Sequence, residues 1–149
     1  MKLQIDVQNL QKQIPITPDQ IASTVKKILR RERVLSAQLS IVFVTDKEIR
    51  ALNKKYLKHD YATDVLAFNF LDSPKQTKCL KPKEMNAEII ISTGAVCRQA
   101  KIFNNSLARE LMLYVIHGIF HLLGFDDHRP KEIKRFRAKE EEILTFLKI

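Results

Sequence analysis

The chain has 149 residues, with 26 Lys and Arg against 17 Asp and Glu, and a formal net charge of +9. A chain of this length normally buries one core, so we expect residues 1–149 to form a single domain. Two cysteines exclude a disulfide framework, and the first residues lack the apolar segment of a signal peptide. Composition therefore predicts a cytoplasmic protein, whose basic charge suits a polyanionic partner such as nucleic acid.

No membrane segment is expected from the sequence. The longest apolar stretch runs from Leu111 to Phe125 and is interrupted by two histidines. A helix needs about 20 apolar residues to cross a bilayer, so this stretch is better explained as a buried core helix.

Strands and helices alternate in the first part of the chain. Alternating apolar residues predict a strand at 3–7, and a capping box at 17–20 with proline at its second position predicts the start of a helix. The same succession follows, with a strand at 39–43 and a second capping box at 45–48. The predicted order is therefore strand, helix, strand, helix.

Two more strands and three helices complete the expected fold. The strands are predicted at 65–70 and 87–91, and the segment 72–84 between them is rich in lysine and proline and predicts a loop. Helical patterns then cover roughly 93–103, the stretch from a Ser106 N-cap to Gly124, and the residues after Pro130. We expect an α/β (α+β) fold, a single domain in which about five helices cover a small mixed four-stranded sheet.

Three of the four histidines and two of the three glycines lie in one segment, HGIFHLLGFDDH. His117 and His121 are four residues apart, so on a helix their imidazoles lie on one face at a spacing that suits two ligands of one cation. Gly124 can end the helix in a left-handed conformation and turn the chain so that His128 approaches the pair. We expect these three histidines to hold one Zn²⁺ ion.

The helix that carries this pair is apolar nearly all round from Leu107 to Leu123, which predicts that it is buried. Glu110 and Tyr114 share a stripe with the two histidines and are candidates to support the ligands. Buried polar groups without partners cost roughly 1–3 kcal/mol each, and a metal ion would satisfy the imidazoles. The alternative is a set of core histidines bonded to backbone groups.

Three protein ligands leave one position of a zinc ion open, which is typical of catalytic sites. A zinc peptidase would carry glutamate directly after the first histidine, where this chain has Gly118. RNA carries its own 2′-hydroxyl nucleophile and has less need of that group, and the positive charge also favours RNA as the substrate. The sequence does not assign a general base, so the catalytic residues stay unknown.

The segment HGIFHLLGFDDH resembles the His-Gly-x-x-His-Leu-x-Gly-Tyr-Asp-His signature of the YbeY family, rRNA maturation factors of bacteria and organelles. Further similar stretches lie at 52–56 and 63–66, and the resemblance extends from about residue 36 to the end. It implies a metal-dependent endoribonuclease specific for single-stranded RNA. Such an enzyme would act in maturation of the small-subunit (16S) rRNA 3′ end and in ribosome quality control, with the ribosome or its small subunit as partner and zinc on the three signature histidines.

Two departures from the family pattern affect the expected site. The family usually has five residues between its second and third histidines, whereas six intervene here, which makes Asp126 and Asp127 rivals of His128 as the third ligand. We expect His128, because a turn can absorb one residue and zinc favours imidazole. Leu57 stands where the family has an arginine.

Basic residues on both sides of the signature are candidates for binding RNA phosphates. They are Lys54, Lys55, Lys58 and Arg129. Solvated surface lysines are the ordinary alternative. Two other functions stay open. One is a ribosome-associated RNA-binding factor with a structural metal, and the other is a zinc peptidase, which Gly118 disfavours because a peptidase would carry glutamate there.

Overall fold

The computed structural model describes residues 2–57, 64–70, 84–125 and 127–149. Lys58, Asp126 and nearly all of the loop predicted at 72–84 lie outside these ranges. The described residues form nine elements, and each agrees in type with the sequence prediction. In chain order they are β1 (Lys2–Asn9), α1 (Pro18–Arg31), β2 (Ser36–Val44), α2 (Asp46–Leu57), β3 (Val65–Asn69), β4 (Glu84–Ser92), α3 (Thr93–Phe103), α4 (Leu107–Leu122) and α5 (Pro130–Leu147).

The four strands form one mixed sheet in the order β1-β2-β4-β3. Strands β1, β2 and β4 are parallel, and β3 runs antiparallel to β4 at one edge. The register pairs Ile41 of β2 with Ile89 of β4, and Phe68 of β3 with Glu88 of β4. The predicted fold class is confirmed, and the strand order is new information.

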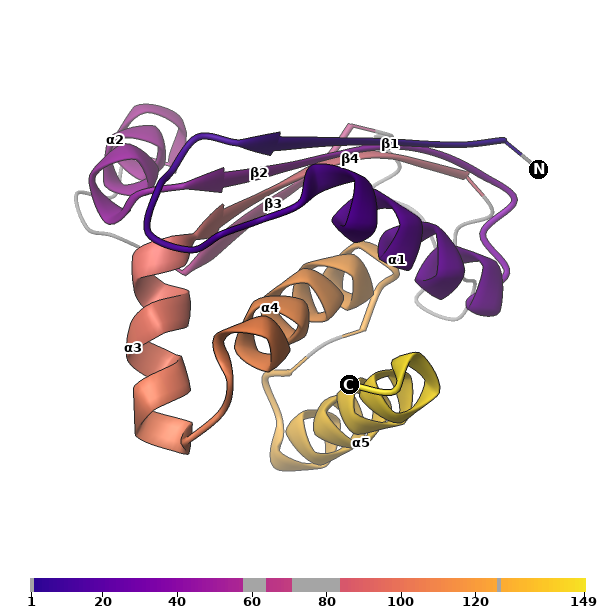
Figure 1. Cartoon of the computed structure of the whole chain (residues 1–149). Helices are drawn as coiled ribbons and strands as arrows, with labels where there is room; N and C mark the ends of the chain where they lie inside the picture. Colours follow the sequence, from indigo (N-terminus) through magenta and orange to yellow (C-terminus); the bar gives the residue numbers. More distant parts are fainter. Residues whose placement is uncertain (1, 58–63, 71–83, 126) are drawn as a thin grey trace.

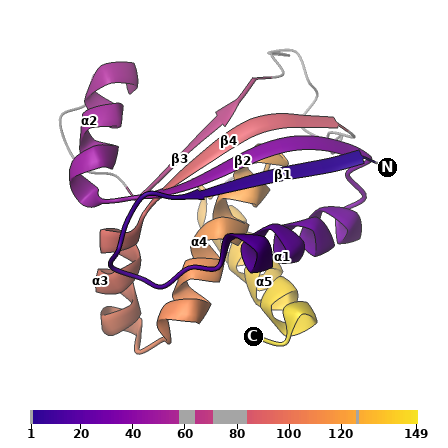
Figure 2. The same ribbon diagram turned by 45° about the horizontal axis from the view of Figure 1, so that its top comes forward.

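Helices cover the two faces of the sheet unequally. Helices α1, α3, α4 and α5 lie on one face, and α2 lies on the other, near one end (Figures 1 and 2). Because side chains alternate along a strand, Ile41 and Ile89 enter the larger core with α4, whereas Val42 and Ile90 enter a smaller core with Ile49 of α2. The sheet thus separates α2 from the helix that carries the histidine pair.

Helix α4 is the central element of the larger core. Ile116, Ile119 and Phe120 are fully buried, as the apolar pattern predicts, but Leu107 is 41% exposed because the helix begins there at the surface. Gly118 packs against the sheet, where a Cβ atom would lie 2.9 Å from Cγ2 and 3.0 Å from Cδ1 of Ile89. Glycine therefore allows α4 to approach β4 closely.

The predicted helix ends are confirmed, but one of the expected side-chain caps is absent. The Ser106 hydroxyl accepts a hydrogen bond from the Arg109 amide at 3.1 Å, and Thr45 caps α2 in the same way. Gly124 has a φ of 94°, the left-handed conformation expected after α4. Helix α1 begins at Pro18 with Thr17 as its N-cap, as predicted, but the Thr17 side chain makes no cap hydrogen bond, and the Gln20 amide donates to the Thr17 backbone carbonyl at 3.1 Å.

A carboxylate joins the start of α2 to the start of α3. Asp46 accepts a hydrogen bond from the Ser92 hydroxyl at 2.5 Å and two from the Arg98 guanidinium, at 2.6 and 3.3 Å. A Cβ atom at Gly94 would collide with this carboxylate. The hydrogen bonds from Arg98 and, to a smaller extent, from Ser92 lower the pKa of Asp46 below its ordinary value of 3.8.

Replacing Asp46 with asparagine tests this junction. A carboxyl group whose pKa is lowered by folding stabilises the protein above its unfolded pKa, and the contribution disappears as the pH falls through the folded value. We expect Asp46→Asn to lower the free energy of unfolding by about 0.5–1 kcal/mol at pH 7, as for a partly exposed pair. Urea unfolding at pH 7, 5 and 3 should show the difference shrinking below about pH 4. A difference that is constant with pH would contradict the assignment.

Substituting Gly118 tests the approach of α4 to β4. Gly118→Ala gains helix propensity of about 1 kcal/mol but forces a methyl group onto Ile89, and overpacking of this kind costs typically 1–3 kcal/mol. We expect a net loss of unfolding free energy, measured by urea denaturation. Combining it with Ile89→Val, which removes Cδ1, should recover at least about 0.5 kcal/mol in a double-mutant cycle. Additive effects would show that the Cδ1 atom of Ile89 does not limit the approach.

Candidate metal centre

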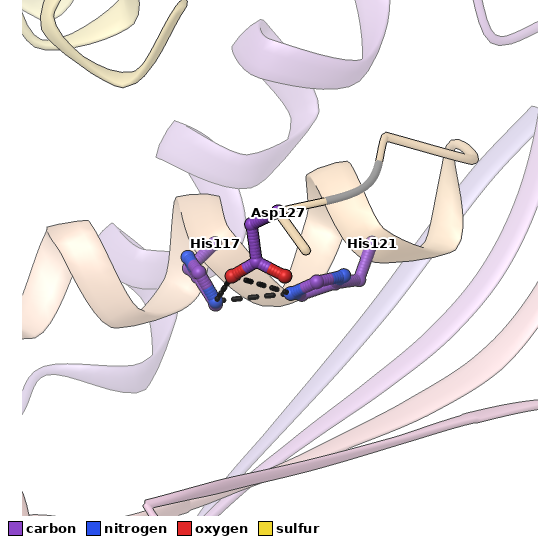
Figure 3. Close-up of side chains that lie close together, drawn as sticks. All are labelled: His117, His121 and Asp127. Carbon is purple, nitrogen blue, oxygen red and sulfur yellow. Dashed lines mark hydrogen bonds and ion pairs between the residues drawn. The ribbon is translucent and has the colours of Figure 1, made fainter. Parts of the chain in front are cut away.

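Two histidines of α4 face each other at the surface of the larger core. Nε2 of His121 lies 3.0 Å from Nε2 of His117, and the two rings meet edge to face (Figure 3). The four-residue spacing on a helix explains why both imidazoles extend from the same face. The structure therefore brings this predicted pair together with two nitrogen donors directed at one region of space.

Asp127 is the third donor in this region. Its Oδ2 atom lies 3.6 Å from Nε2 of His117 and 3.8 Å from Nε2 of His121 (Figure 3). Among the described residues, these three side chains form a group that could hold a metal ion, and His128, which is exposed, is not part of it. The assignment of His128 as third ligand stays a prediction.

The separations within this group suit a metal ion. Two atoms bound at ~2.0–2.1 Å to one tetrahedral zinc ion lie roughly 3.3 Å apart. The observed distances of 3.0, 3.6 and 3.8 Å lie on either side of that value. The side chains of His117, His121 and Asp127 are 35%, 34% and 32% exposed, so the group is open to solvent on one side.

Helix α5 supplies a second layer behind the histidines. Oε2 of Glu140 lies 3.4 Å from Nδ1 of His117, and the Glu140 side chain is 14% exposed. The Phe136 ring is buried and lies 4.6 Å from the His117 ring and 5.2 Å from the His121 ring, measured between centroids. When Nδ1 of His117 carries its proton, the nitrogen donates to Glu140 and leaves the Nε2 lone pair available to a metal.

Sequence reasoning missed Glu140. The only local signal was its spacing of four residues from Phe136, which places both side chains on one face of α5. The two residues predicted to support the ligands have other partners. Glu110 accepts a hydrogen bond from the side-chain amide of Asn105 at 2.8 Å. The Tyr114 hydroxyl donates a hydrogen bond to the Asp64 carboxylate at 3.5 Å.

Tyr114 lies one turn before His117 on α4. Burial raises the pKa of the Tyr114 hydroxyl above its ordinary value, and the negative charge of Asp64 raises it further. The hydroxyl therefore stays protonated at neutral pH and remains a donor to Asp64. This pair joins α4 to the start of β3 on the same polar stripe as the histidines.

The predicted RNA-binding residues lie in different places. Lys54 and Lys55 are exposed in the last turn of α2, on the other face of the sheet from α4. Arg129 lies two residues after Asp127, and its side chain is 86% exposed beside Glu132, at an N···O distance of 3.8 Å. Their role, like that of Lys58 outside the described residues, stays a prediction.

By its fold and its donor group, the protein is a small α/β domain with a solvent-accessible candidate metal site on a buried helix. Residues 6–148 match the family model described as Endoribonuclease YbeY. The chain belongs to this family, which confirms the resemblance drawn from the histidine segment.

Individual relatives agree with this membership. Proteins named Endoribonuclease YbeY from Syntrophus aciditrophicus and Clostridium botulinum are 32% and 31% identical, with matches that cover 99% and 97% of this chain and 91% and 98% of theirs. One from Myxococcus xanthus is 42% identical over 107 residues, which are 72% of this chain and 35% of that longer protein.

A solution structure of a Thermotoga maritima protein shares the fold, with a TM-score of 0.62 and 23% identity over 97% of this chain and 91% of the other. Within the described part of the chain, no helix has the length and apolar character needed to span a membrane.

Glu140 can be tested through the affinity for metal. Removing a partner that orients a metal-bound histidine typically costs 10–100-fold in affinity. We expect Glu140→Gln to weaken Zn²⁺ binding about 10-fold, measured by competition with a chromophoric chelator. Glu141→Gln is the matched control, since Glu141 is on the same helix but pairs with Arg109 at 2.8 Å. Equal affinities for the two variants would mean that Glu140 does not orient His117.

Proposed function

We propose that this protein is a metal-dependent endoribonuclease that cleaves single-stranded RNA. The observation that carries the proposal is the convergence of His117, His121 and Asp127 on one open site, in a chain that belongs to a family described as an endoribonuclease. Two imidazoles and a carboxylate form a donor set of the kind found in catalytic zinc sites. Zinc is therefore the ion that we propose for this site.

The chain's own residues would position both the ion and the substrate. His117 and His121 would hold the metal, Glu140 would orient the His117 ring, and Phe136 would form an apolar wall behind both rings. When bound, a divalent ion supplies Lewis-acid polarisation of a phosphoryl oxygen. Arg129, close in sequence to Asp127, would contact a phosphate beside the scissile one.

The exposure of the site favours catalysis over a purely structural metal. Structural zinc sites are closed by four protein ligands, whereas catalytic sites keep a position open. Here three candidate ligands each expose about a third of the side chain. A substrate oxygen could therefore reach the ion.

Peptide hydrolysis is the less suitable alternative. The glutamate of a zinc peptidase would have to replace Gly118, but this position is buried and packs against Ile89. An additional side chain there would meet the sheet. The tertiary packing thus supports the argument made from the sequence against a peptidase.

The net charge of +9 supports a polyanionic substrate. Lys54, Lys55, Lys58 and Arg129 are the residues that we propose to bind RNA phosphates. By the resemblance to the family, the RNA would be the 3′ end of the small-subunit rRNA, with the ribosome or its small subunit as partner in the cytoplasm. Late ribosome quality control would be a second task of the same activity.

His117→Ala tests the function directly. Loss of one ligand should lower the rate of single-stranded RNA cleavage by at least about 100-fold, since the remaining donors would no longer hold the ion in place. The assay compares a labelled single-stranded RNA, its duplex and denatured casein. Circular dichroism verifies that the variant is folded.

We expect the wild type, but not His117→Ala, to cleave the single-stranded RNA. Chelation should abolish this cleavage, and added Zn²⁺ should restore it. Unchanged cleavage by folded His117→Ala would contradict the catalytic metal site. Casein cleavage without RNA cleavage would instead indicate a peptidase. RNA binding without any cleavage would indicate a binding factor with a structural metal.

A further inference from the structure

We propose that Asp127, and not His128, is the third metal ligand, so that this protein holds its ion with two imidazoles and one carboxylate. The proposal rests on the proposed function for the presence of an ion at this site. It concerns which side chain completes the site and which metals the site prefers. It departs from the sequence expectation, which placed three histidines around the ion.

The turn after α4 determines which residue returns to the histidine pair. Gly124 leaves the helix with a φ of 94°, and the Phe125 amide donates a hydrogen bond to the Phe120 carbonyl at 3.0 Å. The Phe125 ring then packs against Phe120 and Phe136, with centroids 5.3 and 6.5 Å apart. This packing anchors the turn, and the residue two positions later, Asp127, lies over the histidines (Figure 3).

The beginning of α5 anchors the other end of the same turn. Pro130 is the first residue of α5, and the Arg129 amide donates a hydrogen bond to Oε1 of Glu132 at 3.2 Å. His128 therefore lies between Asp127 and the N-cap of α5, where its side chain is exposed. For His128 to take the place of Asp127, the chain would have to shift by one residue between two anchored ends.

A carboxylate ligand changes the chemistry of the site. Two neutral imidazoles and one carboxylate carry a charge of about −1, whereas three imidazoles carry none. Carboxylate oxygen suits Mn²⁺ better than imidazole does, while imidazole suits zinc. We therefore expect this site to discriminate less between Zn²⁺ and Mn²⁺ than a site of three histidines.

Metal titration of the purified full chain tests the assignment without an activity assay. Zn²⁺ and Mn²⁺ affinities are measured for the wild type, Asp127→Ala and the matched neighbour His128→Ala. Loss of a direct ligand should cost at least as much as loss of an orienting partner, roughly 10–100-fold. We expect that loss for Asp127→Ala and less than about a twofold change for His128→Ala.

A third variant gives a readout that does not depend on the stability of Asp127→Ala. Asp127→His keeps three donors but replaces oxygen with nitrogen, so the visible absorption of the Co²⁺-loaded protein should change and the preference for Zn²⁺ over Mn²⁺ should rise about 10-fold. His128→Ala should leave the Co²⁺ spectrum as in the wild type. Thermal unfolding verifies that each variant is folded.

Two results would overturn the proposal. One is a loss of Zn²⁺ affinity in His128→Ala with wild-type affinity in Asp127→Ala. The other is a Co²⁺ spectrum that Asp127→His leaves unchanged. Both are independent of RNA cleavage. If the wild type cleaves RNA but the His128→Ala variant loses its metal, only the ligand assignment is refuted. If the protein binds metal through Asp127 but does not cleave RNA, only the proposed function is refuted.

Discussion

The close packing of α4 against the sheet is the constraint on which the candidate site depends. Gly118 allows the helix to lie close to Ile89 of β4, on the face of α4 that packs against the sheet. On the helical wheel, His117 and His121 both lie on the same side of Gly118, away from the contact with Ile89. His117 and His121 lie at the margin of the core, partly exposed but supported by the helix behind them. A rigid, buried helix is a suitable base for ligands, because its backbone cannot move without disturbing the core.

Helix α5 completes the site because it packs on the same margin. Phe136 closes the apolar side of the two imidazoles, and Glu140 pairs with the nitrogen of His117 that faces away from the metal position. Such outer partners select the tautomer and the ring orientation of a ligand. The core and the site therefore share residues, so a change in the packing between α4 and α5 is also a change in the site.

The two faces of the sheet pack against different helices, and one of these faces carries the candidate metal site. The face with α4 and α5 holds the donor group, whereas the other face packs α2 through a small apolar cluster. The junction of Asp46 with Ser92 and Arg98 ties α2 to the start of α3, across the end of the sheet. The position of α2, and with it that of Lys54 and Lys55, is therefore coupled to the helices on the face that carries the site.

The sequence by itself determined the elements, the fold class, the family and the histidine pair, because each depends on local periodicity or on a contiguous motif. Thr17 is the N-cap of α1 as predicted, but the side-chain hydrogen bond of the expected capping box is absent, and the Gln20 amide donates to the Thr17 backbone carbonyl. Only the tertiary structure decided the strand order, the contact of Glu140 with His117 and the approach of Asp127 to the pair. These features join residues from different elements, and they depend on how a turn between two packed helices is anchored, which spacing along the chain does not encode.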